Sequence, residues 1–540
     1  MLKGAFVAGM ATLFLPWAIN AAAANPAVHL IPEDDGVLAV NSSGIPLWHR
    51  YIDLSQPLQV ESLPGGDFSI NGDIRISSTG RLMPSTADGA LQFTEREPAY
   101  VWTMPNPVYD TPSGSYSPPV FDSKGNAWTL IQDGAAGKAR VMQYVAKKGV
   151  WKSIKTLPLV WSTAHLEVDV LGNVTIALIT ASEDTGWSIN AVRYEPDMGW
   201  SKPEAIYTEP YTPNAFLNYD VASDKSGNAV IAAENASLGA ITLVYSIEAH
   251  AWQPYQQAPL PTNFAGEQTN YIALSRSDNG KYLNLVYLAR VQSKPKLVQR
   301  AYYGSSFDRS TLKFGPAEYL PGSLGIAGDG SSSTENYLDQ VKAVVDNSGT
   351  ATVIWSDGGN VPVQALGVYA NRRVGGVWKD ASRLSKQHLN MTTDFSSIEV
   401  DADGRVAGCT TGGTSQSDGT ATTDFVVFKF IPNTGWSTDI PASWARGLTT
   451  RTRIAWIGSG KAVGTYMVAP DSDVGYLGLS YSVFDGMQWG ESETVTPEVT
   501  NAFFQSVAST EKGTTLLEFD PSVDDQTVTK VYASFLIGAQ

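Results

Sequence analysis

Two short apolar stretches flank a glycine in the second half of the chain: Val341-Lys-Ala-Val-Val-Asp346 precedes Gly349, and Ala351-Thr-Val-Ile-Trp355 follows it. Neither stretch sustains the 3.6-residue period of a helix, and both read as short β-strands. Glycine takes the left-handed conformation that closes a short hairpin, and an aspartate before it accepts hydrogen bonds from backbone amides. The segment therefore predicts an antiparallel hairpin with an Asp-x-x-Gly turn.

The same turn recurs along the chain. Its clearest copies are Asp122-Ser-Lys-Gly125-Asn126, Asp169-Val-Leu-Gly172-Asn173 and Asp224-Lys-Ser-Gly227-Asn228, and looser copies are centred on Gly80, Gly280, Gly349, Gly404, Gly460 and Gly513. These nine glycines lie 45 to 69 residues apart, with a mean of about 54. A tryptophan follows most of the turns by 25 to 32 residues, at Trp151, Trp200, Trp252, Trp378, Trp436 and Trp489. Phe307 and Trp102 occupy comparable places in the units of Gly280 and Gly80.

Each unit thus predicts an inner strand, a glycine hairpin, two middle strands and an outer strand that opens with Trp. Many four-stranded units without helices predict an all-β fold, a β-propeller with a single ring of eight or nine blades. Only 27 residues follow Gly513, which suffices for about three strands. We therefore expect the N-terminal segment Ile45-Pro-Leu-Trp48-His-Arg-Tyr51 to supply the missing outer strand and close the ring, with Trp48 in the vacant position.

The composition excludes several classes of protein. The chain has 540 residues and 43% hydrophobic residues, enough to bury a large core, so it is not intrinsically disordered. Its one cysteine, Cys409, excludes an internal disulfide and a zinc site with several cysteine ligands. The formal net charge of −16 makes nucleic acid and anionic lipid poor partners.

The first residues resemble an export signal. Lys3 precedes an apolar run that reaches about Ile19, and Ala22 and Ala24 suit a small-residue cleavage site. We expect residues 1–24 to be a signal peptide and residues 25–540 to be the propeller, in the periplasm of a bacterium or secreted from it. An uncleaved membrane anchor is the alternative, although the run is short for a span of about 20 apolar residues. After cleavage no membrane insertion is expected.

The repeats resemble those of bacterial exported β-propellers of the sialidase/BNR-like and related kinds. Ser223-Asp224-Lys-Ser-Gly227 and Phe121-Asp122-Ser-Lys-Gly125 keep the Asp and Gly of the sialidase Asp-box but not its spacing or its Trp. The resemblance therefore implies the architecture and not glycosidase activity. The stretch from Val37 to Trp48 also resembles the quinoprotein-type repeat over about a dozen residues, from which no cofactor is carried over.

Seven residues before each glycine lies one strand position whose residue type varies around the ring. It is occupied by Asp73, Pro118, His165, Asp220, Ala273, Lys342, Ser397, Arg453 and Ser506. The positions one and three residues later are mostly apolar, as repeated packing requires. The residue type at the seventh position before the glycine, in contrast, changes from unit to unit. Varied and often ionisable side chains at the same strand position of each unit favour a ligand site at the face where the inner strands begin. A channel lined by solvated, mutually paired charges is the alternative.

Two further features fall on the same face. Residues 322–336 form a Gly/Ser-rich loop before Lys342, which is either a lid or a surface insertion. Three arginines and a tryptophan precede another inner strand: Arg446, Arg451, Arg453 and Trp444. Guanidinium groups pair with carboxylates and aromatic faces stack on sugars, so this group suits an acidic glycan. Local pairing with surface Asp and Glu is the alternative.

The candidate chemistry is limited. His165 as a general base beside a cation would serve β-elimination from a uronic acid, and a paired Asp73 and Asp220 would serve glycoside hydrolysis. Asp401-Ala-Asp403-Gly404 is explained by turn chemistry, with a calcium site as the alternative, so no cofactor other than calcium is considered. Three hypotheses remain: a propeller that binds a glycan or a partner protein, a polysaccharide lyase or glycoside hydrolase acting on an acidic polysaccharide, and a non-catalytic envelope scaffold.

Overall fold

The computed structural model describes seven strand segments before residue 101 and most of residues 101–537. The early segments are 28–33, 36–41, 46–51, 60–62, 68–70, 74–76 and 82–83. The gaps within 101–537 are 104–105, 110–114, 134–135, 183–185, 211–217, 236–238, 266–270, 295–296, 325–336, 359–366, 386–389, 392–396, 416–420, 439–447, 459, 470–477, 487–488, 491–492, 496–501, 511–513 and 522–530.

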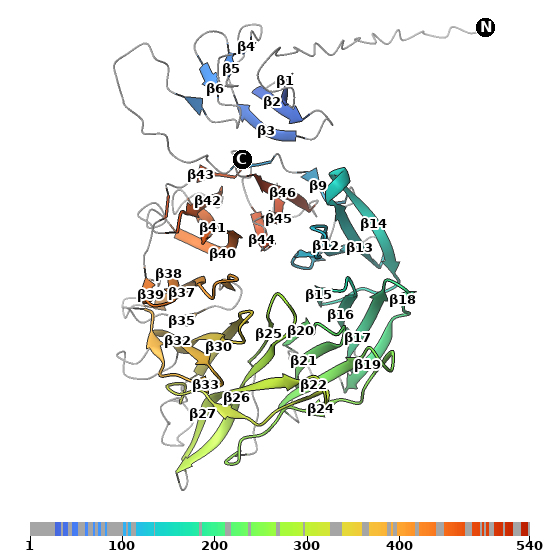
Figure 1. Cartoon of the computed structure of the whole chain (residues 1–540), viewed down its shortest axis with the longest axis vertical. Coiled ribbons are helices and arrows are strands. Elements are labelled where there is room, and N and C mark those ends of the chain that lie inside the picture. Colours follow the sequence, from blue (N-terminus) through green and yellow to red (C-terminus); the bar gives the residue numbers. More distant parts are fainter. Residues whose placement is uncertain are drawn as a thin grey trace, which may run out of the picture. The chain divides into compact units, whose positions relative to one another are not determined.

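Eight antiparallel sheets follow one another around a ring, which confirms the predicted β-propeller and fixes its blade count (Figure 1). Blade 1 contains β10 (Ser115–Tyr116), β11 (Val120–Phe121), β12 (Ala127–Asp133), β13 (Lys138–Val145), the 3-10 helix η1 (Ala146–Lys148) and β14 (Val150–Leu157). Blade 2 contains β15 (Thr163–Val168), β16 (Val174–Ser182), β17 (Gly186–Glu195), β18 (Gly199–Trp200) and β19 (Glu204–Glu209). Blade 3 contains β20 (Tyr219–Ser223), β21 (Ala229–Asn235), β22 (Gly239–Ser246), β23 (Ala251–Trp252) and β24 (Gln256–Gln257).

The next blades repeat this order. Blade 4 contains β25 (Ile272–Arg276), β26 (Leu283–Lys294), β27 (Leu297–Asp308), β28 (Lys313–Phe314) and β29 (Glu318–Tyr319). Blade 5 contains β30 (Tyr337–Val345), β31 (Ala351–Gly358), β32 (Gly367–Val374), β33 (Val377–Trp378) and β34 (Ser382–Arg383). Blade 6 contains β35 (Asn390–Met391), β36 (Ser397–Val400), β37 (Val406–Ser415), β38 (Ala421–Ile431) and β39 (Gly435–Thr438).

The last two blades complete the ring. Blade 7 contains β40 (Leu448–Gly458), β41 (Lys461–Ala469), β42 (Gly478–Phe484) and β43 (Glu493–Thr494). Blade 8 contains β44 (Ala502–Ser509), β45 (Thr515–Pro521) and β46 (Tyr532–Ile537), joined by β8 (Val101–Trp102) and β9 (Asn106–Pro107). The final blade is therefore closed by a segment from much earlier in the chain.

The chain divides into two compact units, residues 105–535 and residues 1–104 with 536–540. The second unit holds two small sheets of its own. One contains β1 (Val28–Glu33), β2 (Gly36–Asn41) and β3 (Pro46–Tyr51), and the other contains β4 (Val60–Ser62), β5 (Phe68–Ile70), β6 (Ile74–Ile76) and β7 (Leu82–Met83). In the described part of the chain, no helix has the length and apolar character needed to cross a bilayer.

Closure by an N-terminal strand is confirmed, but the predicted strand was wrong. Trp48 lies in β3, which pairs with β2 in the separate three-stranded sheet. Trp102 in β8 fills the vacant position instead, opposite Leu536 of β46, and is almost fully buried. Both segments carry an aromatic residue between short polar stretches, and only the later one follows the two extra sheets. Of the nine glycines, Gly80 and Gly513 lie outside the described residues, and the turns of the other seven each fall within one blade.

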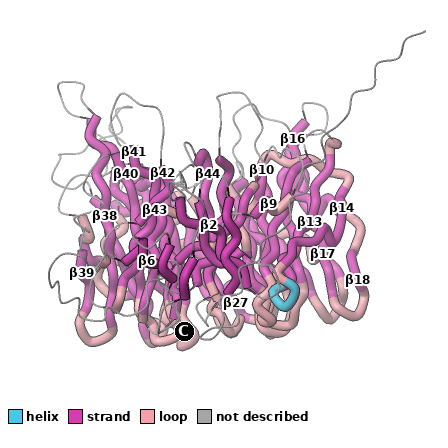
Figure 2. The backbone as a smooth tube through the Cα atoms, turned by 90° about the horizontal axis from the view of Figure 1, so that it is seen from above, coloured by secondary structure: helices cyan, strands magenta, loops and turns pink. Residues whose placement is uncertain are grey.

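The predicted turn chemistry is confirmed. In blade 1, Asp122 Oδ1 accepts hydrogen bonds from the amides of Lys124 and Asn126, both at 2.9 Å, and the Asn126 side chain donates to Oδ2 at 2.9 Å. The same three bonds recur around Asp169 and Asp224. The hairpin glycines have positive φ angles, such as +86° at Gly172. The short described turns gather along one edge of the ring, at the bottom of Figure 2.

Aromatic pairs join the third and outer strands of most blades. Tyr194 contacts Trp200 with ring centroids 5.1 Å apart, and Tyr245 contacts Trp252 at 5.5 Å. In blade 4 the pair is Phe307 with Phe314 at 5.3 Å. Phe307 was therefore assigned wrongly, because it lies on the third strand β27 and Phe314 takes the outer position. Two phenylalanines seven residues apart make the choice ambiguous in sequence.

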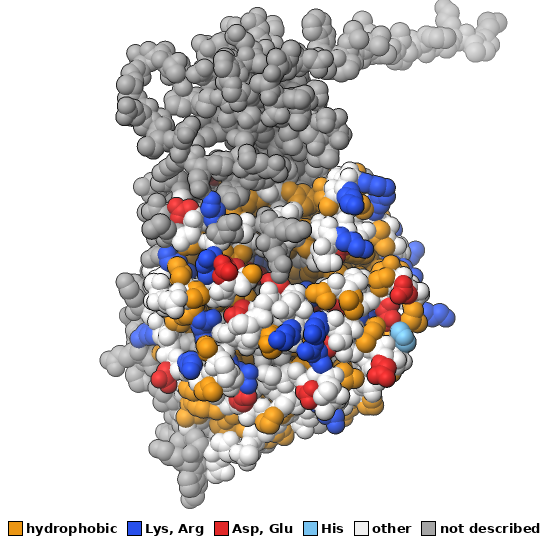
Figure 3. Space-filling model, in the orientation of Figure 1, with side chains coloured by type: hydrophobic (Ala, Val, Ile, Leu, Met, Phe, Trp, Pro, Cys, Tyr) orange, Lys and Arg blue, Asp and Glu red, His pale blue; other side chains and the backbone are white. Residues whose placement is uncertain are grey.

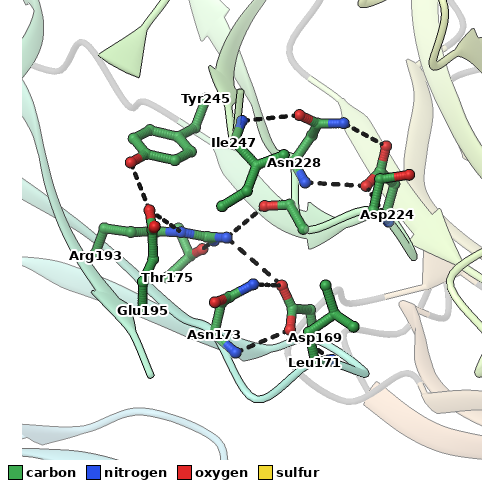
Figure 4. A network of polar contacts seen from close by, with 12 residues as sticks. Asp169, Leu171, Asn173, Thr175, Arg193, Glu195, Asp224, Asn228, Tyr245 and Ile247 are labelled. Atoms are coloured by element: carbon green, nitrogen blue, oxygen red, sulfur yellow. Dashed lines mark hydrogen bonds and ion pairs between the residues drawn. The ribbon is translucent and has the colours of Figure 1, made fainter. Parts of the chain in front are cut away.

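A cation from each of three blades lies over the aromatic residue of the next blade. Arg193 of β17 lies 5.0 Å from the ring centroid of Tyr245, pairs with Asp169 at 3.5 Å, and donates to Thr175 and to the Gly227 carbonyl (Figure 4). Arg372 repeats the arrangement, 3.8 Å from the centroid of Phe430 in blade 6, with bonds to Thr352 and Gly404. Lys429 similarly lies 4.8 Å from the centroid of Phe484. These contacts tie neighbouring blades together.

The apolar core lies between neighbouring sheets. One cluster joins Leu130 and Val141 of blade 1 to Leu166 and Ile176 of blade 2, and others repeat this between later blades. The middle strands are consequently buried on both faces, as in β21, where all seven residues are buried. This double burial explains why those strands read as nearly continuous apolar runs instead of alternating ones.

Removal of the closing tryptophan will destabilise the ring. Trp102→Ala deletes a buried side chain from the blade 8 sheet, and such deletions cost about 3–5 kcal/mol in free energy of unfolding. We expect its urea midpoint to fall well below that of the wild type, measured by tryptophan fluorescence and far-UV circular dichroism. Trp48→Ala is the control, because β3 is not part of that sheet. Equal losses in both variants would contradict closure by Trp102.

The hairpin glycines allow strain to be separated from crowding. Gly172→Ala places a Cβ in open space, so only the positive φ of 86° penalises it, by about 1–2 kcal/mol. Gly227→Ala has a similar φ of 95°, but its Cβ would lie 2.9 Å from Asn173 Nδ2 of the preceding blade. We expect the second variant to lose clearly more stability in denaturant titrations. A loss no larger than that of Gly172→Ala would show that the Asn173 side chain moves away from the added Cβ without a cost in stability.

Candidate functional site

Four inner strands bring ionisable side chains together at the centre of the ring. Strands β15, β20, β25 and β30 are contacting neighbours in the order of their blades. The side chains concerned are His165, Glu167, Asp220, Arg276 and Lys342, which we term the inner-ring cluster. Three of them stand at the register predicted from sequence, and two do not.

His165 and Asp220 meet across the boundary between blades 2 and 3. His165 Nδ1 lies 3.7 Å from Asp220 Oδ1, and the imidazole lies against Tyr219 with ring centroids 4.6 Å apart. The two side chains keep 39% and 35% of their surface exposed. They are therefore held in place and still accessible to a ligand.

Backbone groups of two blades fix the carboxylate of Asp220. Its Oδ1 accepts the amide hydrogen of Val221 at 2.9 Å, and its Oδ2 accepts that of Leu274 in blade 4 at 3.1 Å. Ser397 makes the corresponding bond between later blades, where its hydroxyl accepts the amide of Ile454 at 3.2 Å. Part of the variation at this register thus serves to join inner strands, as well as presenting polar groups.

The environment keeps His165 uncharged. Burial among protein atoms lowers the pKa of His165, the Asp220 carboxylate raises it, and the positive charge of Lys342 lowers it further. Because burial is the largest of these effects, the imidazole is neutral at pH 7 and has a nitrogen free to accept a proton. The influence of Lys342 also places its ammonium group within electrostatic reach of His165, although two blades lie between them in sequence.

An ion pair that the sequence did not predict spans blades 2 and 4. Arg276 Nε lies 2.6 Å from Glu167 Oε1, and Arg276 Nη2 donates to the Val168 carbonyl at 3.1 Å. Burial raises the pKa of Glu167 to about 7, and the Arg276 charge acts against that rise. The sequence does mark Glu167, because the position five residues before each glycine is mostly apolar and only Glu167 and Glu399 place a carboxylate there.

Glu399 occupies the same register on blade 6. Burial raises the pKa of its carboxyl to about 8, and the negative charge of Asp278 in blade 4 adds to the rise. The side chain is partly buried on β36. Glu399 is therefore mostly protonated at neutral pH and can donate a hydrogen bond from the inner ring.

Of the remaining predicted site residues, only Arg453 has a described side chain. Arg453 lies in β40 of blade 7, where its guanidinium donates to the Thr452 carbonyl at 2.9 Å and lowers the pKa of the nearby Cys409 thiol, although burial raises that pKa overall. Arg451 lies in the same strand, and its side chain is outside the described residues. Asp73, Trp444 and Arg446 also lie outside them, as does most of the 322–336 loop. Their roles stay predictions.

The acidic turn of blade 6 is neutralised by the chain itself. Asp401 Oδ1 accepts the amides of Asp403 and Arg405, and its Oδ2 lies 3.1 Å from Arg405 Nη1. Asp403 lies 3.1 Å from Arg405 Nη2. Among the residues that the structure describes, no group of three or more His, Cys, Asp and Glu side chains is placed to hold a metal ion.

Comparison with known proteins gives structural likeness only. No family model and no curated protein matches this chain. Among solved structures, the polysaccharide lyase Uly1 matches at 10% identity and a TM-score of 0.41, over 69% of this chain and 89% of that one. Puromycin hydrolase matches at 14% and 0.42, over 79% and 62%, and the Aleuria aurantia lectin at 13% and 0.30, over 61% and 97%. At this level the likenesses carry no argument about activity, and the fold rests on the strand pairings above.

The raised pKa of Glu399 makes stability depend on pH. Between about pH 4.5 and 8 the folded state binds a proton that the unfolded state has released, so the free energy of unfolding falls as pH rises. Glu399→Gln removes this titratable group. We expect the free energy of unfolding of the variant to exceed that of the wild type by more than about 1 kcal/mol at pH 8, with a smaller difference at pH 5. Denaturant titrations at both values measure it, with exposed Glu204→Gln as the control. A difference that does not change with pH would contradict the assignment.

Proposed function

We propose that this chain is an exported β-propeller that binds a glycan at the inner-ring cluster. The observation that carries the proposal is the contact of His165 with Asp220 across two blades, with Lys342 at the same register of a third blade and near enough to act on His165 electrostatically. A neutral imidazole, a fixed carboxylate and an ammonium group offer a hydrogen-bond acceptor, a second acceptor and a cation. Sugar hydroxyls and a uronate carboxylate are the complementary groups.

The accessibility of these groups favours a glycan over a flat protein surface. His165 and Asp220 are partly exposed on inner strands, which a narrow polar ligand reaches more readily than a broad partner. Glu167 and Arg276 form an ion pair with each other, so the inner strands carry polar side chains of both charges. Export rests on the signal-like residues 1–24, and the periplasm or the medium of a bacterium is the proposed location.

Lyase activity is the second candidate, because His165 is held neutral. As a base it would take the proton from C5 of a uronate while Lys342 stabilises the negative charge that develops on the carboxylate. The C4–O bond then breaks, a C4–C5 double bond forms, and the leaving oxygen takes a proton. The product would be an unsaturated uronate that absorbs ultraviolet light.

Binding is tested by calorimetry of a short uronate oligosaccharide, chosen from an array of glycans. We expect His165→Gln, Asp220→Asn and Lys342→Met each to weaken binding about tenfold or more, because each removes a hydrogen bond to or from a charged group. Ser506→Ala is the matched control, since it stands at the same register on blade 8. If no variant changes the affinity, or if no glycan binds at all, the inner ring is not a glycan site.

The same proteins distinguish binding from turnover. Wild-type protein is incubated with several acidic polysaccharides while ultraviolet absorbance is followed. Rising absorbance that His165→Gln abolishes supports the lyase, and binding without any rise supports a binding protein. Absorbance that rises equally with His165→Gln would exclude His165 as the base.

A further inference from the structure

The outer edge of blade 1 is basic, although the protein as a whole is acidic. Residues 120–160 contain seven Lys and Arg against two Asp, whereas the whole chain has 37 basic and 53 acidic residues. Asp122 is occupied by its own turn, and Asp133 pairs with Arg140 at 2.9 Å. No acidic residue follows until Glu167. Figure 3 shows the resulting group of blue side chains at the edge where Figure 1 draws β14.

Four lysines define this surface, which we term the lysine strip: Lys147, Lys148, Lys152 and Lys155. The first two lie in η1, and the others lie on β14. Three are exposed and Lys155 is partly exposed. None pairs with a carboxylate among the described residues. At about 3.3 Å per residue, the strip from Lys148 to Lys155 is roughly 20 Å long.

The strand that carries the strip differs from its counterparts. β14 has eight residues, whereas the outer strands described in the other blades have two to six. Two of its aliphatic side chains are exposed, Val150 at 44% and Ile154 at 38%. The strip therefore combines cations with exposed apolar side chains along one edge strand.

Protection of an exposed edge does not account for the whole strip. Lysines and bulges both prevent another strand from adding to a sheet. β14 has both, because its register with β13 shifts between Val141 and Met142, where Ile154 is the extra residue. Two lysines on the strand would serve that purpose, yet Lys147 and Lys148 lie in the turn outside the ladder. Four neighbouring lysines repel one another, and an anionic ligand would relieve that repulsion.

We propose that the lysine strip binds a linear acidic polysaccharide, as an anchoring surface separate from the inner ring. The ammonium groups meet carboxylates or sulfates spaced along the polymer, and the apolar faces of its sugars cover Val150 and Ile154. A polysaccharide is favoured over an acidic peptide because the bulge and the lysines oppose the strand addition that an extended peptide would use. The choice of a glycan as the ligand rests on the proposed function, whereas the assignment of the lysine strip as a binding surface does not.

The test compares two variants of equal charge. In the strip variant, Lys147, Lys148, Lys152 and Lys155 are replaced by Gln. In the control variant, Lys225, Lys281, Lys313 and Lys379, exposed lysines of other blades, are replaced by Gln. Binding of polygalacturonate, neutral dextran and poly-L-glutamate is measured by affinity electrophoresis at low and high salt. Circular dichroism and melting temperature show that both variants are folded.

We expect wild type to bind polygalacturonate in a salt-sensitive way and to ignore dextran. The strip variant should lose at least tenfold in affinity, and the control variant less than twofold. Equal losses in both variants, or no loss in either, would overturn the strip. Tighter binding of poly-L-glutamate than of polygalacturonate would overturn the choice of polysaccharide.

The inner ring and the strip can fail independently. A uronate disaccharide is shorter than the roughly 20 Å strip, so disaccharide binding that His165→Gln weakens and the four-lysine variant keeps reports on the inner ring. The polymer reports on the strip through the four-lysine variant. Loss of polymer binding in the strip variant with no disaccharide binding would leave this inference standing and reject the inner-ring site.

Discussion

In five blades the inner strand ends at a turn that an aspartate closes, and the carboxylate of that aspartate accepts hydrogen bonds from two backbone amides. This bond fixes where the strand stops and where the second strand begins. A slip of one residue would move each side chain to the other face of its sheet. The register set at the turn therefore determines which residues face each neighbouring blade.

The same turns also serve the contacts between blades. Asp169 holds its own turn and receives Arg193, whose guanidinium donates to the turn carbonyl of the next blade and lies over Tyr245. Arg193 is almost fully buried, and a buried charge without partners would cost several kcal/mol. Tyr245 in turn packs on Trp252 of its own blade and donates to Glu195 at 2.6 Å. One aromatic residue thus joins two blades, which explains why aromatic residues recur in every unit.

The sequence predicted the parts of the fold that local chemistry controls. The turn needs Asp and Gly at fixed spacing, so eight of the nine glycines marked blades, and the apolar strands between them followed. The choice between Trp48 and Trp102 depends on pairing between strands about 430 residues apart, which no local pattern encodes. Phe307 and Phe314 posed the same difficulty at short range, because either can open a strand.

The candidate site was predicted to the same extent. Counting back seven residues placed His165, Asp220 and Lys342 correctly on inner strands, since the turn fixes that register. It could not show that Asp220 would bond to Leu274, or that Arg276 would pass over blade 3 to reach Glu167. Those contacts depend on the curvature of the ring. Arg453 also stands on an inner strand, where it donates to the Thr452 carbonyl, and its role in a site stays a prediction.

The distribution of charge has a consequence for how an anionic polymer approaches. At physiological salt, exposed charges act over about 8 Å, so a polymer near the surface experiences local charge and not the net value. The chain as a whole carries more acid than base, whereas the lysine strip attracts a polyanion along roughly 20 Å. Where acidic residues dominate, the polymer is repelled, which narrows the set of surfaces that it can occupy. Local basic edges on an acidic protein therefore orient a polyanion better than a uniformly basic surface, which would hold it in many positions.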